Sequence, residues 1–169
     1  MKKFELTNEF ITNMFGTKLF RIRALVEFGD VEAGELGGYV EKESNLGHDD
    51  NAWVYDNAWV YGDAQVSGDA RVCGNARVYG DARVCGNGDY AYAHGFGSVN
   101  RTTTFFRLKD CGVGVRCGCF YGTLAQFRDK IRETHGETKK AQEYLMLADL
   151  MELRFEEDEN EVGNRKYVE

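Results

Sequence analysis

Residues 51–86 read NAWVYD, NAWVYG, DAQVSG, DARVCG, NARVYG and DARVCG, which are six consecutive units of six residues without a gap. Ala holds the second position of every unit, Val the fourth, and Gly the sixth in all but the first. Residues two positions apart on an extended chain point to the same side, and Gly and Asx tolerate the positive φ of a tight bend. Each unit is therefore predicted to form a short strand and a bend, with Val and Ala inside.

A bend after every strand folds such a chain into a prism. Three units per turn would place equivalent residues 18 positions apart. This spacing predicts four stacked pairs: Trp53 with Arg71, Trp59 with Arg77, Gln65 with Arg83, and Tyr61 with Tyr79. The first two are candidate cation–π stacks. Cys73 and Cys85 fall on different faces, and no disulfide between them is expected.

The repeat resembles that of the hexapeptide-repeat proteins, and this resemblance implies a left-handed parallel β-helix that assembles as a homotrimer. The predicted fold class is therefore mainly β: a left-handed parallel β-helix of hexapeptide repeats. It is expected to carry N-terminal strands and a C-terminal β-hairpin with a two-helix appendage.

The flanks of the repeat predict further elements. Alternation over residues 19–28 indicates a strand with one buried face, paired with residues 3–7 through a turn near Gly16. Residues 34–44 look like a degenerate first coil, with Val40 and Ser44 at inward positions. Residues 101–109 and 113–120 read as two strands of a hairpin. A helix capped by Thr123 follows and ends at His135 and Gly136, and a second helix runs from about Thr138 to Arg154.

These elements divide the chain into five parts. Residues 1–50 hold the N-terminal strands and first coil, 51–88 the regular β-helix, 89–122 an irregular segment and the hairpin, 123–155 the two helices, and 156–169 an acidic tail. The second helix has an apolar stripe that is too wide for one contact surface. We expect it to pack on its own chain and on another subunit.

Three flanking motifs carry a second resemblance: FRIRAL at residues 20–25, GELGGYV at 34–40 and CGCFYGT at 117–123. They are similar to phage and prophage hexapeptide-repeat proteins, which are mostly uncharacterised and some of which are labelled transferases. The resemblance spans nearly the whole chain. The repeat is specific for the fold but not for the function, because one scaffold supports many roles.

Composition limits the partners. The formal net charge is −7, and most of the excess lies in the acidic tail. Binding to double-stranded nucleic acid is therefore not expected. The N-terminus has no signal-peptide pattern and no stretch approaches membrane-spanning length, so a cytoplasmic protein without membrane contact is predicted. Five cysteines and no secretion signal indicate reduced thiols.

Aromatic and basic residues on the outer faces are the candidate binding residues, because exposed large aromatics often mark an interface. Stacking that stiffens the coil is the equally weighted alternative. The candidates are Trp53, Trp59, Tyr61, Tyr79, Arg71, Arg77, Tyr90 and Tyr92.

His94 is the candidate catalytic residue, since enzymes of the hexapeptide-repeat type resemble one another in placing a histidine base near a groove between subunits. His94 lies just beyond the regular coils, whereas His48 and His135 lie elsewhere in the flanks. A positioned histidine can deprotonate an acceptor hydroxyl or amine. However, no loop interrupts the repeats to wall an acyl-donor site, and no basic cluster for its phosphates is obvious.

Cys111, Cys117 and Cys119 lack the ligand number and spacing of a zinc site, so buried free thiols and no metal are predicted. The function predicted is a non-enzymatic trimeric binding protein of phage or prophage origin without a cofactor. It would act in counter-defence by binding a host protein or a small signalling nucleotide. The alternatives are a hexapeptide-repeat acyltransferase using acyl-coenzyme A, and a structural virion or assembly component.

Overall fold

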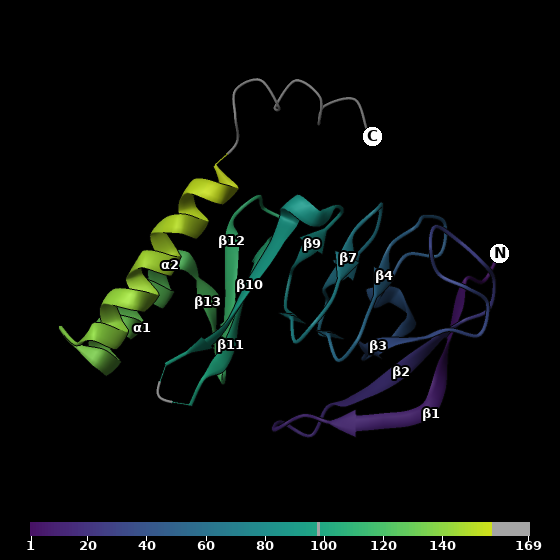
Figure 1. Ribbon diagram of the computed structural model, residues 1–169, viewed down its shortest axis with the longest axis horizontal. Helices are drawn as coiled ribbons and strands as arrows, with labels where there is room; N and C mark the ends of the chain where they lie inside the picture. The colour runs from purple at the N-terminus through teal and green to yellow at the C-terminus, as the bar shows by residue number, and fades with distance from the viewer. Residues whose placement is uncertain (98, 157–169) are drawn as a thin grey trace.

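A computed structural model describes residues 1–97 and 99–156, so nearly all of the predicted acidic tail lies outside the described residues. The described part of the chain is mainly β, with two helices after the last strand (Figure 1). A repeat solenoid occupies the middle, with an N-terminal hairpin along one side and a mixed sheet-and-helix unit at its C-terminal end.

The repeats form a β-solenoid of two-residue strands. These strands are β4 (Trp53–Val54), β5 (Trp59–Val60), β6 (Gln65–Val66), β7 (Arg71–Val72), β8 (Arg77–Val78) and β9 (Arg83–Val84). They stack in parallel as β4 on β7, β5 on β8 and β6 on β9. Every repeat Ala and Val is at most 1% exposed. The predicted inward positions and the eighteen-residue register are thus confirmed.

The bends explain the glycine at the sixth position of the unit. Gly62, Gly68, Gly74 and Gly80 have φ between 64° and 69°. In the first unit Asp56 takes this position with φ 52°. Aspartate is among the few residues other than glycine that visit the left-handed region with little strain, so the bend survives the exchange.

The N-terminal strands extend one face of the solenoid. β1 (Phe4–Thr12) pairs antiparallel with β2 (Lys18–Ala24), and β2 pairs with β3 (Leu36–Val40). The predicted pairing is confirmed, but the strand ends at Ala24 instead of residue 28, and Leu19 is buried on its other face. β3 then runs parallel to β5, with Val40 opposite Val60. The degenerate first coil is therefore part of the stack, although Ser44 is exposed and Asn45 is the buried residue. The Asn45 amide donates to the carbonyls of Gly62 and Ala64, which compensates its burial.

The segment after the repeats is more regular than predicted. Beyond a short 3₁₀ turn at Asn87–Asp89, β10 (Tyr90–Phe96) pairs antiparallel with β11 (Arg101–Arg107), and β11 with β12 (Val113–Cys117). The hairpin is confirmed, but the second predicted strand is wrong in its extent. It folds back at Gly118 and Cys119 into β13 (Phe120–Thr123), because Gly118 takes φ 59°.

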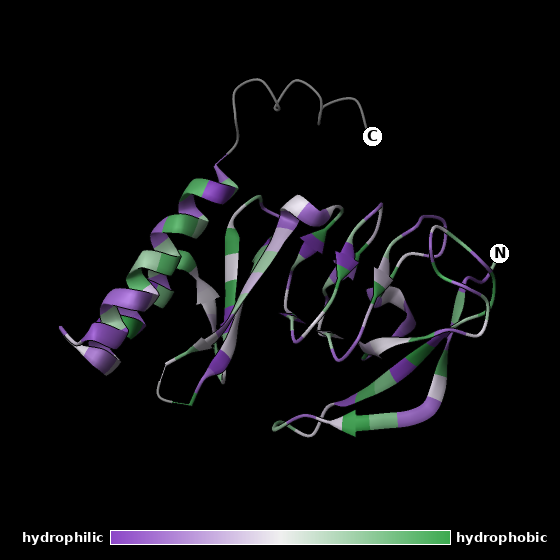
Figure 2. Ribbon diagram, viewed as in Figure 1, coloured by the Kyte–Doolittle hydropathy of each residue, from purple (hydrophilic) through white to green (hydrophobic). Residues whose placement is uncertain are grey.

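Two helices cover the outer face of this four-stranded sheet. α1 (Leu124–His135) begins at the predicted Thr123 cap and ends at Gly136, and α2 (Lys139–Phe155) begins at Thr138. α2 buries Ala141, Tyr144, Ala148, Met151 and Phe155. Hydrophobic and hydrophilic residues are mixed along it (Figure 2), and Met146, Leu150 and Leu153 remain more than half exposed.

The sheet thus has two different faces. Tyr90 and Phe106 belong to the same buried cluster as the solenoid core, whereas Phe105, Val115 and Cys117 pack with the helices. This alternation follows from the period of two along a strand. The four-stranded sheet closes the C-terminal end of the solenoid on one face and carries the helices on the other. No helix in residues 1–97 and 99–156 is long and apolar enough to cross a membrane.

Candidate functional site

The prediction of an exposed aromatic surface is wrong for Trp53, Tyr61 and Tyr90, which are buried. Trp59 and Tyr79 are partly exposed, and Tyr92 is exposed. Trp53 is 0% exposed, because the Phe4 and Phe28 rings lie edge-on against it at 6.3 and 5.3 Å between centroids. Tyr61 is 4% exposed beneath Leu19 and Tyr39 of the N-terminal sheet. Both side chains point out of the coil, but the N-terminal segment covers them. The driving force is the apolar area that this cover removes from water.

The predicted stacks have different outcomes. Arg77 lies 3.8 Å from the Trp59 ring centroid, and the Tyr61 and Tyr79 rings lie 4.6 Å apart at an interplanar angle of 33°. Both predicted contacts are confirmed. Arg71 has the predicted register opposite Trp53 but pairs with Asp30 at 2.7 Å instead of stacking. The cation–π prediction is therefore wrong at this position, because Trp53 is enclosed by other rings.

Tyr90 and Tyr92 serve mainly to attach the sheet to the solenoid. Tyr90 is 8% exposed, and its hydroxyl donates to the Arg71 carbonyl and contacts the Cys73 thiol. Burial raises the pKa of the Tyr90 hydroxyl above its usual range. The Tyr92 ring is exposed and its hydroxyl approaches Gly74, where a side chain would collide with it. These contacts fix the end of the solenoid against β10.

Three arginines meet where the hairpin tip, the solenoid and the sheet come together. Arg77, Arg101 and Arg116 line a pocket of about 300 Å³ with Trp59 and Tyr61. Its remaining lining comes from the β1–β2 turn and from the ends of β11 and β12, namely Asn13, Met14, Thr102 and Gly118. Figure 1 shows the β1–β2 tip reaching toward this end of the sheet. We refer to this cavity as the arginine pocket.

Arg77 is held rigidly on one wall. Its Nη1 donates to the carbonyls of Asn57, Asn75 and Ala76 at 2.9–3.3 Å. Its guanidinium plane rests on Trp59. Burial lowers the pKa of Arg77, although an arginine side chain remains charged at neutral pH. Arg77 therefore forms a preorganised, flat, positively charged surface.

Arg116 is only 7% exposed and lies among aromatic rings. Its guanidinium carbon is 5.0 Å from the Tyr79 ring, 5.6 Å from Phe15 and 5.9 Å from Tyr61. Burial raises the pKa of Tyr61, and the charge of Arg116 opposes this rise. Within residues 1–97 and 99–156, no carboxylate lies within ion-pair distance of Arg77, Arg101 or Arg116.

The charge of this pocket contrasts with that of the chain. The protein carries a net charge of −7, yet none of the described lining residues is Asp or Glu. A buried cation without an ion-pair partner costs free energy. Three cations beside aromatic walls can compensate this cost by binding an anion, most favourably one attached to a flat ring.

His94 lies beside this pocket. Its Nδ1 is 2.8 Å from the Thr102 hydroxyl, and Thr102 lines the cavity, while the imidazole itself is exposed. The other two histidines make structural contacts. His48 stacks on Phe4 and accepts a bond from the Lys3 amide, and His135 stacks on Tyr144.

Sequence reasoning missed Arg101 and Arg116, as well as the hairpin tip. The sequence does contain an indication for Arg116, because this arginine is the only charged residue in a predicted strand of small and apolar residues, on the opposite side from Val113 and Val115. Arg101 and the tip gave no comparable signal, because their approach to the solenoid is a consequence of tertiary folding.

The cysteines are free, but two of the three flanking thiols are not buried as predicted. Cys111 and Cys119 are exposed because each lies in a turn, whereas Cys117 is buried in β12. In the part of the chain that the structure describes, no group of three or more His, Cys, Asp or Glu side chains could hold a metal ion.

The protein is a β-solenoid whose C-terminal end is closed by a sheet-and-helix unit. Comparison with known protein families supports the solenoid. Residues 52–68, 64–76 and 70–86 match the model of the YdcK beta solenoid repeat. The chain is thus similar to that family in its repeats, and the match does not extend to the flanks that complete the pocket. No curated protein matches the chain.

Proposed function

We propose that this protein is a non-enzymatic binding protein whose ligand is an anion carrying a planar ring, of the nucleotide class. The observation that carries this proposal is the nearly buried Arg116 guanidinium, which faces the arginine pocket without an ion-pair partner among the described residues. Two further arginines and two aromatic walls surround the same space.

The geometry suits the two parts of a nucleotide separately. One face of Arg77 rests on Trp59, and the side chain also lines the cavity, so a base can stack on the guanidinium. Arg101 and Arg116 provide forked donors for a phosphate group. Because Arg77 is already fixed by three carbonyls, little side-chain entropy is lost when a ligand binds to it.

We further propose the biological setting suggested by the sequence resemblance. The solenoid is left-handed, belongs to the phage and prophage hexapeptide-repeat proteins, and forms a homotrimer in the cytoplasm of the host. Sequestering a signalling nucleotide would make it a counter-defence protein. A host protein is the other form of partner in this setting, and a structural role in the virion is the alternative without a ligand.

A hexapeptide-repeat acyltransferase is the second candidate, and one observation favours it. His94 bonds to Thr102 on the lining of the arginine pocket, so a general base would lie next to a site for a phosphorylated acyl donor. Transfer of an acetyl group from acetyl-coenzyme A that is lost in His94→Ala would favour this candidate. Loss of a general base costs about 10²–10⁴-fold in rate.

Calorimetric titration with the four ribonucleoside 5′-monophosphates tests the preferred function. We expect at least one to bind, and Arg116→Met to weaken it by roughly 10-fold or more, the value of a charge-assisted hydrogen bond. Arg83→Gln is the matched control. Arg83 holds the same position in its repeat and donates to the Asp63 and Ala82 carbonyls, but it lies outside the pocket. Absence of binding by all four at millimolar concentration would refute the proposal.

A further inference from the structure

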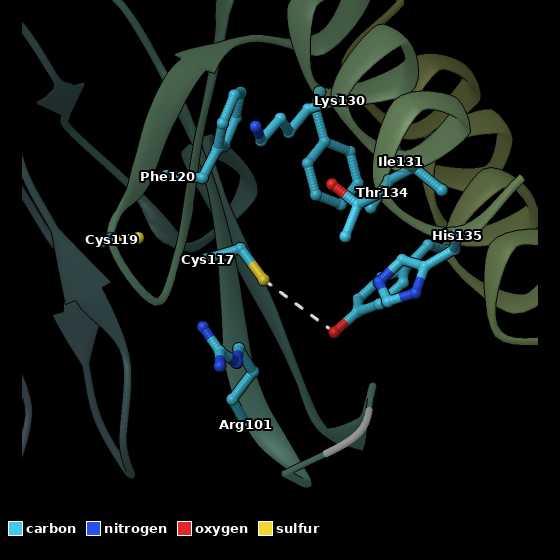
Figure 3. A pocket seen from close by; sticks show the side chains of 10 residues that line it. Arg101, Cys117, Cys119, Phe120, Lys130, Ile131, Thr134 and His135 are labelled. Carbon is cyan, nitrogen blue, oxygen red and sulfur yellow. Dashed lines mark hydrogen bonds between the residues drawn. The ribbon is translucent and has the colours of Figure 1, made fainter.

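A second pocket, of about 220 Å³, opens on the helix side of the four-stranded sheet (Figure 3). Its lining comes from β11, β12 and β13 on one side and from α1 and α2 on the other. Figure 3 shows Arg101 and Lys130 on opposite sides of this space, with Phe120 near the end of the Lys130 side chain and Ile131 next to Thr134 on the helix. We refer to it as the helix-side pocket.

The helix-side pocket has the same sign of charge as the arginine pocket. Arg101 and Lys130 are cations in its lining, and none of its described lining residues is Asp or Glu. Among the described residues, Lys130 is paired with Glu133, at 3.8 Å on the exposed surface of α1. A ligand phosphate would therefore compete only with an exposed ion pair, which contributes little.

Arg101 belongs to the lining of both pockets. It stands at the start of β11, and its guanidinium packs directly over Gly118, where any Cβ would collide with it. Thr102 and Arg116 line the cavity on one face of the sheet, and Cys117 and Phe120 line the cavity on the other. Arg101 is thus the residue that the described linings of the two pockets share, and it stands between them at this end of the sheet.

We propose that the two pockets form one bipartite site and that its ligand is a dinucleotide, with the internucleotide phosphate at Arg101. This inference rests on the proposed nucleotide-binding function. One base stacks on Arg77 in the arginine pocket. The other lies in the helix-side pocket against Phe120 and Ile131, with its phosphate at Lys130.

The helix-side pocket also offers a hydroxyl donor. The Tyr144 hydroxyl lies 3.9 Å from the Cys117 sulfur, and Tyr144 is part of the pocket lining. Burial raises the pKa of Tyr144 to about 12, so the hydroxyl is protonated at neutral pH and can donate to a base or phosphate. The apolar walls and this donor are the combination expected for a small-molecule site.

The test compares the monophosphate that binds best with its own linear 5′-phosphorylated dinucleotide, titrated into the wild-type protein and Lys130→Gln. We expect the dinucleotide to bind at least 10-fold more tightly, and Lys130→Gln to weaken it roughly 5- to 10-fold without affecting the monophosphate. Lys140→Gln, at a lysine of α2 that lines neither pocket, is the matched control.

The outcomes separate the two proposals. Equal affinity for both ligands, or a dinucleotide unaffected by Lys130→Gln, overturns the bipartite site while monophosphate binding still supports the proposed function. Arg101→Gln should weaken the binding of the dinucleotide more than the binding of the monophosphate. This result would support the position of the internucleotide phosphate at Arg101. If neither ligand binds, the proposed function and this inference both fail.

Discussion

Replacing Trp53 distinguishes a structural aromatic residue from a binding one. Trp53 is fully buried between Phe4 and Phe28, and it joins the N-terminal segment to the solenoid. Trp53→Ala therefore removes a buried indole and leaves a cavity, which costs about 3–5 kcal/mol. In a chain of this size each kcal/mol lowers Tm by roughly 2–4 °C, so the expected fall is on the order of 6–20 °C.

A second substitution at the same position sharpens this test. The Trp53 Nε1 is buried and has no hydrogen-bond partner in the part of the chain that the structure describes. Trp53→Phe deletes this unsatisfied donor and keeps most of the apolar area, so it should cost far less than Trp53→Ala. Both variants are compared with the wild type by thermal unfolding monitored with circular dichroism. A Trp53→Ala protein with an unchanged Tm that loses a binding partner would refute the structural role.

Four other substitutions have definite expected outcomes. Arg116→Met removes a nearly buried cation that has no ion-pair partner among the described residues, so the variant should have an unchanged or higher Tm and weaker ligand binding. A large fall in Tm would show that Arg116 has a structural role. Val72→Asp buries a charge inside the solenoid, so this variant should already be unfolded at 25 °C and show no cooperative transition on heating. A Tm near that of the wild type would mean that Val72 does not point inward. Burial raises the pKa of Tyr144 in the folded protein from 10.0 to about 12, so its contribution to the free energy of unfolding is present below pH 10 and is lost as the pH rises to 12. Tyr144→Phe should therefore reduce the fall in the free energy of unfolding between pH 10 and pH 12, measured by chemical denaturation, and an unchanged pH dependence would contradict this. Sedimentation equilibrium should give a trimer that Leu150→Glu weakens, because this residue lies on the exposed apolar stripe of α2; a wild-type monomer at micromolar concentration would exclude the trimer.

The solenoid was predictable because its information is local and repeated. A fixed period, with Ala and Val at alternate positions and Gly at the bend, determines which side chains point inward and which residues stack. The register of Trp59 with Arg77 follows from this period together with three units per turn, and the structure has it. The caps of α1 and α2 were predictable for the same reason, since Thr123 and Thr138 act within one helical turn.

The candidate site was predictable only in part, because it depends on long-range packing. The period shows that Trp53, Trp59 and Tyr61 leave the coil, but not that residues 1–31 return to cover two of them. Likewise, nothing in the repeat indicates that the end of β11 brings Arg101 beside Arg77. The irregular spacing of Gly in residues 88–97 concealed β10, whose pairing with β11 is non-local.

A crystal of the wild-type protein soaked with an 8-bromo nucleoside monophosphate tests the central claim most directly. Anomalous scattering locates the bromine, and therefore the base, independently of any model of the ligand. We expect the bromine peak beside the guanidinium of Arg77, with phosphate density at Arg116 or Arg101. A well-occupied ligand bound elsewhere, or an empty arginine pocket at saturating concentration, would contradict the account.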